Sequence, residues 1–180
     1  RPILNDFKRF LEVEQGFRLN TISKHFKSMK TLDQWFADYA VSHQNKTNQI
    51  IHYICVPAIF FSIIGMFMSI PRTFLSKNIN LDNPFIENWA TLVVILLLLF
   101  YVRLSVATAI KMLILSALCI LGNYYLGAVA PLLYTSIGIF VVAWIGQFYG
   151  HHVEGIKPSF FKDLQFLLIG PAWVMKKIFG

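Results

Sequence analysis

The 180-residue chain is 56% hydrophobic, 16% aromatic and only 14% charged. Soluble domains carry roughly 25% charged residues, so this composition excludes an ordinary soluble enzyme and also a disordered chain. The formal net charge of +7 does not indicate nucleic-acid binding, because the basic residues flank apolar runs, as they do in membrane proteins. We therefore predict an all-α, polytopic membrane protein: a helical bundle of about four transmembrane helices with additional interfacial helices.

The N-terminal segment, residues 1–28, differs from the rest of the chain. It is basic, has no long apolar run, and lacks the apolar core and small-residue cleavage site of a signal peptide. Because Met29 resembles a natural start, we treat this segment, with its His25, as an extension without an assigned function. Residues 29–180 are expected to form a single membrane-embedded catalytic domain. Within it, residues 31–39 carry apolar side chains at helical spacing, which predicts an amphipathic helix at the membrane surface.

Four apolar segments are long enough, or nearly so, to cross about 30 Å of hydrocarbon. We place these spans at about residues 50–70, 85–102, 112–126 and 129–149. Pro57 and Pro158 are expected to shape helix ends.

A last apolar stretch, residues 164–179, is too short and too interrupted for a further span. Gly170 and Pro171 break it, and two lysines follow. We expect an interfacial or re-entrant helix here, with Trp173 as an anchor at the membrane interface.

The basic residues predict the orientation in the membrane. With four spans, both termini lie on the same side, and 14 of the 16 Lys and Arg residues fall on that side. The other two, Arg72 and Lys77, lie between the first and second spans. The positive-inside rule therefore places both termini in the cytoplasm, in a bacterial inner membrane or in the endoplasmic reticulum of a eukaryote.

Four histidines lie where the chain enters the first span and where it leaves the fourth: His43, His52, His151 and His152. An even number of spans puts all four at the same membrane face. Neutral imidazole is the commonest metal ligand, so these residues are candidate metal ligands. On one continuous helix His43 and His52 would be about 900° apart and would face opposite ways. Both can face one site only if a helix begins between them, which the polar run 44–48 allows.

Two further polar residues share helix faces with these histidines. Asn48 lies four residues before His52, and Glu154 lies three residues after His151. We therefore regard Asn48 and Glu154 as candidate catalytic residues. The spacing also leaves open that the histidines are only polar anchors at the membrane interface and that Glu154 is a solvated charge at a helix end.

Two stretches of the chain resemble a known family. They are His43-x4-Asn48-x3-His52-x4-Pro57 in the first half and Trp144, residues 147–151, Glu154 and Pro158-Ser159 in the second. The chain resembles, over about residues 29–179, the family of the fungal 2-hydroxy fatty acid dioxygenase, an enzyme named for the metabolism of phytosphingosine to odd-numbered fatty acids.

The resemblance implies an Fe(II)-dependent dioxygenase that performs α-oxidation: a 2-hydroxy fatty acid reacts with O2, and the acid one carbon shorter results. It implies that His43, His52 and His151 bind Fe2+, with His152 as a further candidate. The implied partners are the 2-hydroxy fatty acid, O2 and the lipid bilayer, and not nucleic acid.

Lys46 and Lys157 are close in sequence to the two motifs, and we expect them to attract the substrate carboxylate. Two other functions are weighed against the enzyme. One is a non-catalytic lipid-binding or assembly protein of the membrane with interfacial histidines. The other is a small transporter, which is disfavoured because no charged residue lies in the middle of the first or fourth span.

Overall fold

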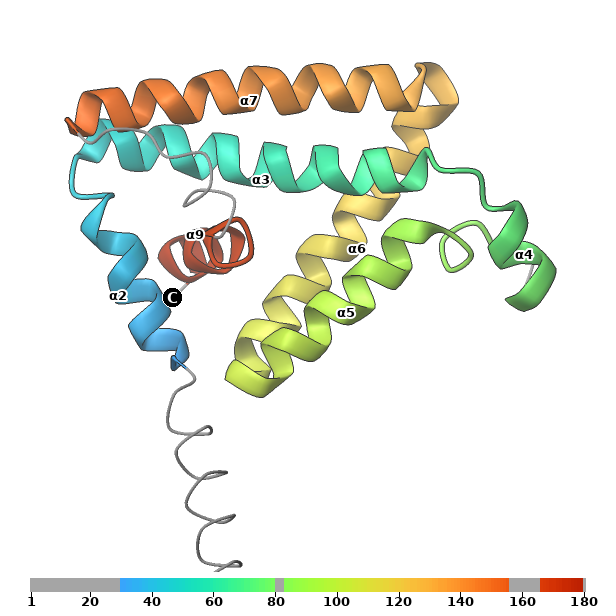
Figure 1. The fold of residues 1–180 in the computed structure, drawn as a ribbon, viewed down its shortest axis with the longest axis horizontal. Coiled ribbons are helices and arrows are strands. Elements are labelled where there is room, and N and C mark those ends of the chain that lie inside the picture. The colour runs from blue at the N-terminus through green and yellow to red at the C-terminus, as the bar shows by residue number, and fades with distance from the viewer. Residues whose placement is uncertain (1–29, 80–82, 156–165, 180) are drawn as a thin grey trace, which may run out of the picture. The chain divides into compact units, whose positions relative to one another are not determined.

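The computed structural model describes residues 30–79, 83–155 and 166–179. The chain divides into two units, residues 1–31 and 32–180, and nearly all of the first unit lies outside the described residues, as do His25, Lys157 and Pro158. The described residues form seven helices: α2 (Leu32–Val41), α3 (Lys46–Met68), α4 (Thr73–Ile79), α5 (Trp89–Leu104), α6 (Val106–Val129), α7 (Leu132–Glu154) and α9 (Gly170–Phe179) (Figure 1).

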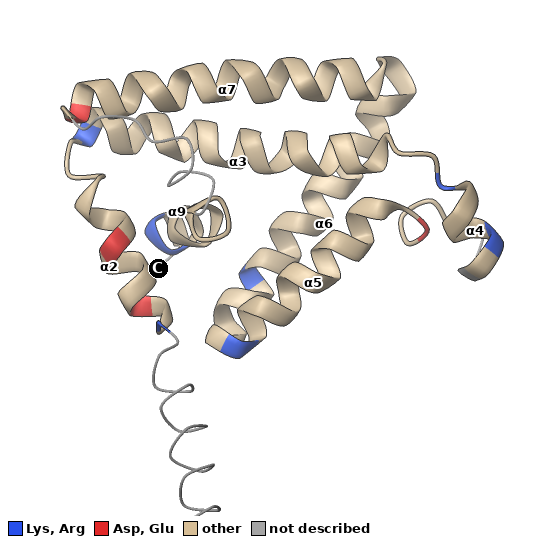
Figure 2. Ribbon diagram, viewed as in Figure 1, with Lys and Arg blue, Asp and Glu red and all other residues tan. Residues whose placement is uncertain are grey.

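Three of these helices, α3, α6 and α7, are long and apolar enough to cross a membrane. The fourth apolar helix, α5, has 16 residues and measures only about 24 Å. Charged residues lie toward the ends of these four helices and leave their middle turns apolar (Figure 2). The prediction of an all-helical membrane protein is confirmed.

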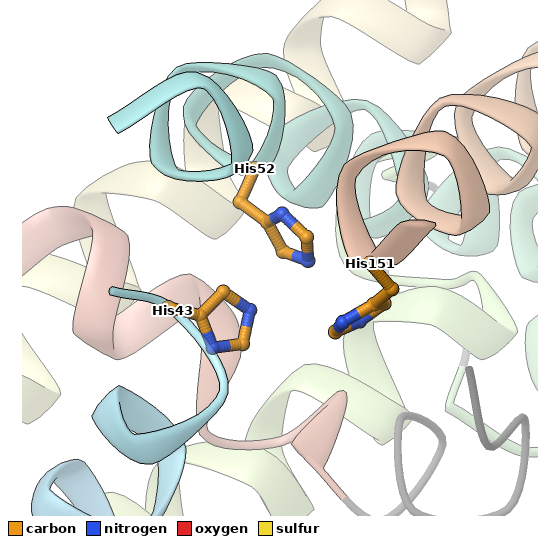
Figure 3. Close-up of side chains that lie close together, drawn as sticks. All are labelled: His43, His52 and His151. Carbon is orange, nitrogen blue, oxygen red and sulfur yellow. The ribbon is translucent and has the colours of Figure 1, made fainter. Parts of the chain in front are cut away.

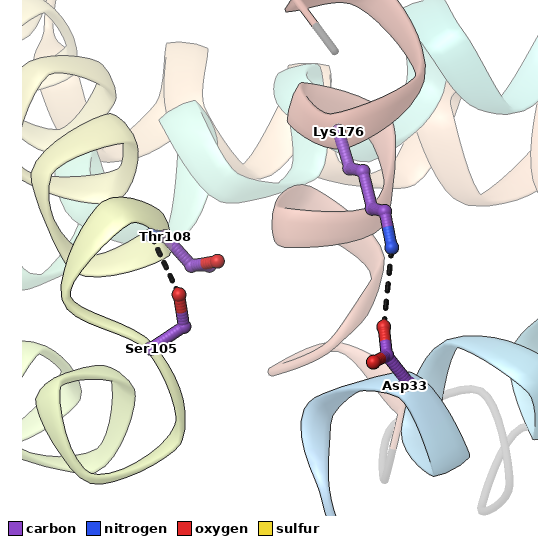
Figure 4. Close-up of polar contacts among 4 residues, drawn as sticks. All are labelled: Asp33, Ser105, Thr108 and Lys176. Atoms are coloured by element: carbon purple, nitrogen blue, oxygen red, sulfur yellow. Dashed lines mark hydrogen bonds and ion pairs between the residues drawn. The ribbon is translucent and has the colours of Figure 1, made fainter.

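Each expected span overlaps one of these four helices, but the ends differ. The largest difference is at α6, which begins at Val106 rather than near Met112. Lys111 does not end the helix, because a lysine near a helix terminus can pack its methylene groups and still extend its amine toward water. Ser105 caps α6, and its Oγ accepts a hydrogen bond from the backbone N–H of Thr108 at 3.3 Å (Figure 4).

Pro57 is found inside α3 and not at a helix end. A proline removes one backbone hydrogen bond from the helix, and membrane helices tolerate this because neighbouring groups satisfy the released carbonyl. The expectation that Pro57 shapes the end of a helix is therefore wrong.

Helices α3 and α7 form the most extensive helix–helix packing among the described residues. The two helices run side by side in opposite directions (Figure 1), so the start of α3 meets the end of α7. Helices α5 and α6 form a second pair, and α6 also packs against α3. The antiparallel pairing of α3 and α7 brings together residues that are about a hundred positions apart in the sequence.

The C-terminal helix α9 packs against α3 and α6. It begins at the Gly170-Pro171 pair, so this pair starts a helix rather than interrupting one, as expected for a proline in the first turn. Trp173 is only 3% exposed and packs against Tyr39 and His43. Trp173 therefore belongs to the protein core and does not face lipid as an anchor would, while its depth at the membrane interface stays a prediction.

Helix α2 lies near α9. An ion pair of 3.2 Å joins Lys176 of α9 to Asp33 of α2 (Figure 4). On the buried side, Phe36 and Tyr39 of α2 enter the same core as Trp173. These contacts fix the end of α2, from which the chain continues directly into the loop that carries His43.

Candidate metal centre

Three histidines from three parts of the fold meet at one end of the α3–α7 pair. His43 lies in the short connection between α2 and α3, His52 in the second turn of α3, and His151 in the last turn of α7. We predicted that a helix must begin between His43 and His52 if both are to face one site. The structure has this break, since α2 ends at Val41 and α3 begins at Lys46.

The three side chains form a compact, buried cluster. One ligand nitrogen from each lies within 4.8 Å of the others, and the rings converge on a common point (Figure 3). The ring centroid of His52 lies 4.3 Å from that of His43 and 5.0 Å from that of His151. The three residues are exposed by 3% or less. Imidazoles at this spacing, shielded from water, are arranged as the ligands of a single metal ion would be.

Backbone carbonyls select the tautomer of two of these histidines. His43 Nδ1 lies 2.6 Å from the carbonyl oxygen of Tyr39, and His52 Nδ1 lies 2.9 Å from that of Asn48. Because a carbonyl oxygen only accepts, each Nδ1 carries the proton and donates it. Nε2 is then the nitrogen that can bind a metal. Metal-binding histidines usually have such a second hydrogen bond, which also fixes the ring orientation.

Aromatic rings hold His43 in the loop. Tyr39 stacks on it with ring centroids 4.0 Å apart and an angle of 10° between the planes. The ring centroid of Trp173 lies 5.6 Å from the ring centroid of His43. The loop position of His43 is therefore as closely packed as the two helical positions.

Asn48 and Glu154, the two candidate catalytic residues, are hydrogen bonded to each other. Asn48 Nδ2 donates to Glu154 Oε2 at 2.9 Å. The same carboxylate accepts the backbone N–H groups of Gln44, at 2.7 Å, and Asn45, at 2.9 Å. A carboxylate is favourable here, because these groups lie at the N-terminus of α3. Glu154 thus joins the end of α7 to the loop of His43 and to the first turn of α3.

Gly150 allows α7 to approach α3 at this point. A Cβ atom at Gly150 would overlap Asn48 Oδ1 and would lie 3.3 Å from His52 Cε1. A larger residue would therefore move α7, and His151 with it, away from the other two histidines.

A small cavity adjoins His52. Its volume is about 20 Å³, which is enough for about one water-sized molecule. Its wall includes the apolar side chains of Val56, Ile59 and Trp144 and also the amide side chain of Gln147. The cavity therefore offers space for one small group beside His52.

The remaining candidates lie elsewhere. His152 is exposed and is not in the histidine cluster of the described residues. Lys46 is exposed at the first position of α3. Sequence reasoning did not select Gln147 or Tyr39 for the site, although Gln147 lies one helical turn before His151 and Tyr39 one turn before His43.

The fold and the site define a class: a helical protein with membrane-spanning segments and a buried three-histidine centre suited to a transition metal. A family model described as "2-hydroxy-palmitic acid dioxygenase Mpo1-like" matches residues 29–180, and the chain belongs to this family. The resemblance seen in the two sequence motifs is thereby confirmed. Searches of the curated proteins and of the solved structures gave no match.

Proposed function

We propose that the protein is an Fe(II)-dependent dioxygenase of the membrane that shortens 2-hydroxy fatty acids by one carbon through α-oxidation. The observation that carries this proposal is the buried cluster of His43, His52 and His151, with ligand nitrogens within 4.8 Å of one another. Membership of the 2-hydroxy-palmitic acid dioxygenase family supports the substrate class.

In this proposal the three histidines would hold Fe2+ through Nε2 of His43 and His52 and through one ring nitrogen of His151. The ion would supply redox chemistry toward O2, since three protein ligands leave coordination positions for other molecules. Asn48 and Glu154 would act by holding the loop, α3 and α7 in register rather than by contacting substrate. The apolar cavity wall would keep bulk water from the reacting groups.

The reaction balances with one O2 for each substrate molecule. For 2-hydroxypalmitate the bond between C1 and C2 breaks, C2 becomes the carboxyl carbon of pentadecanoate, and C1 leaves as CO2. O2 takes up four electrons, three from C2 as it becomes a carboxyl carbon and one from C1 as it becomes CO2, and one molecule of water forms together with the products.

The substrate would reach the centre from the bilayer. Its acyl tail would lie among the apolar helices, and its head would reach the histidines near the ends of α3 and α7. Lys46, and Lys157 outside the described residues, would attract the carboxylate. We further propose that both termini and this end of the bundle face the cytoplasm, in a bacterial inner membrane or in the endoplasmic reticulum.

The test is an assay of purified, iron-loaded protein in mild detergent with 2-hydroxypalmitate, in air and without O2. We expect pentadecanoate only in air, none from the His52→Ala variant, and wild-type product from the His152→Ala variant. If iron-loaded wild type binds the hydroxy acid but forms no shorter acid in air, the enzyme proposal is wrong, and a non-catalytic lipid-binding protein is the function that remains.

A further inference from the structure

Gln147 is a mostly buried polar residue of α7. The residue is only 7% exposed, and its side-chain amide makes no hydrogen bond with any described residue. It lines the cavity beside His52 and lies one helical turn before His151 on α7.

A mostly buried side chain whose amide makes no hydrogen bond with a described residue needs a physical explanation, because nearly all buried polar groups in proteins are hydrogen bonded. The amide nitrogen of Asn123, buried on α6, has such partners and donates to the carbonyl oxygens of Phe61 and Cys119 at 3.0 and 2.9 Å, whereas its amide oxygen has no partner among the described residues. Gln147 has no such contacts, and the space next to it can hold one water-sized group. The cavity beside the Gln147 amide therefore suits a polar group of a bound ligand, which would form the missing hydrogen bond.

We propose that Gln147 is a substrate-binding residue that recognises the 2-hydroxyl group of the fatty acid; this inference rests on the proposed function. A hydroxyl is of the size that the cavity holds, and its O–H can donate to Gln147 Oε1. Of the wall residues on α3, His52 belongs to the histidine cluster, and Val56 and Ile59 are apolar. A site built to bind a hydroxyl rejects an analogue without one, because its own polar group then stays unpaired. Gln147 would therefore distinguish 2-hydroxy acids from ordinary fatty acids.

The test measures binding of 2-hydroxypalmitate and of palmitate to iron-loaded protein without O2, so that no turnover occurs. Wild type is expected to bind the hydroxy acid more tightly. In Gln147→Met and Gln147→Leu, which keep a similar volume, we expect at least a tenfold loss of affinity for the hydroxy acid. Palmitate affinity should change less than twofold, and the iron content should not change. Ser116→Ala is the matched control, since it removes another buried polar group without a hydrogen bond, on α6, and should change neither affinity.

The outcomes separate the two proposals. If wild type prefers the hydroxy acid and both Gln147 variants keep that preference, the assignment of Gln147 is wrong and the dioxygenase proposal stands. If both variants lose iron, Gln147 supports the metal centre instead of binding substrate, and the assignment is again overturned. If iron-loaded wild type shows no preference for the hydroxy acid, the proposed function fails and the assignment fails with it.

Discussion

Glu154 is a single residue whose carboxylate connects the three parts of the chain that carry the clustered histidines. It closes α7 just after His151, accepts backbone N–H groups next to His43, and binds Asn48 in the turn before His52. Removing its charge should loosen the cluster without removing any of the imidazoles.

We expect Glu154→Gln to weaken iron binding by about 10- to 100-fold, the usual effect of losing a residue that supports metal ligands. The measurement is an iron titration of purified protein against a competing chelator. Asp33→Asn is the control, because it removes a carboxylate from an exposed ion pair with Lys176, and such pairs contribute little. Equal iron affinity in wild type and Glu154→Gln would show that the carboxylate has no role in the centre.

The sequence identified His43, His52 and His151, but it could not separate His151 from His152. Adjacent residues on a helix point about 100° apart, and which of them faces inward depends on how α7 is rotated against α3. That rotation is determined by packing, for example by the close contact at Gly150. Gln147 begins the motif of residues 147–151 but was not selected as a site residue, since the role of an amide in an apolar helix is not evident until the cavity beside it is known.

At the level of helices, the contact between α3 and α7 determines whether the site forms. Gly150 and Gly138 lie on the same helix and offer a matched comparison. A Cβ atom at Gly150 would overlap Asn48, whereas a Cβ atom at Gly138 would meet nothing within 4 Å.

Gly150→Ala should destabilise the protein by about 1–3 kcal/mol, as overpacking does, and should also lower its iron content. Gly138→Ala should leave both unchanged or slightly raise stability, because alanine favours the helix. Thermal unfolding in detergent and metal analysis of both variants provide the measurement. Full iron content in Gly150→Ala would mean that the close approach of α7 is not needed for the cluster.

The three long apolar helices and the shorter α5 could be predicted from apolar run length, but other elements could not. The short helix α4, seven residues long, has no extended apolar run to mark it. The packing of α9 was also unpredictable, because an apolar helix face that carries a tryptophan suits lipid and protein core equally well. Only the tertiary contacts of Trp173 with Tyr39 and His43 decide between the two.

For the whole molecule, composition alone predicted a membrane protein, and three helices have the length and hydropathy to cross a bilayer. The proposed orientation rests on the distribution of basic residues. Lys46 is the first residue of α3, at the end with most of the basic residues, and Arg72 follows α3 at the end with the fewest.

Cysteine labelling tests this orientation. In a background with Cys55 and Cys119 replaced by alanine, a maleimide that does not cross membranes should label Arg72→Cys in intact cells. It should label Lys46→Cys only after permeabilisation. Labelling of both positions from the same side would contradict the proposed crossing of the membrane by α3.

The iron content of purified protein reconstituted with Fe2+ without O2 tests the three-histidine metal centre most directly. We predict about one iron per chain in wild type and in His152→Ala, and loss of that iron in each of His43→Ala, His52→Ala and His151→Ala. Each of the four substitutions replaces a histidine by alanine. A difference in iron content between the variants therefore depends on where the histidine lies and not on which side chain is removed. Iron retained at the wild-type level when any of the three clustered histidines is replaced would contradict the three-histidine metal centre.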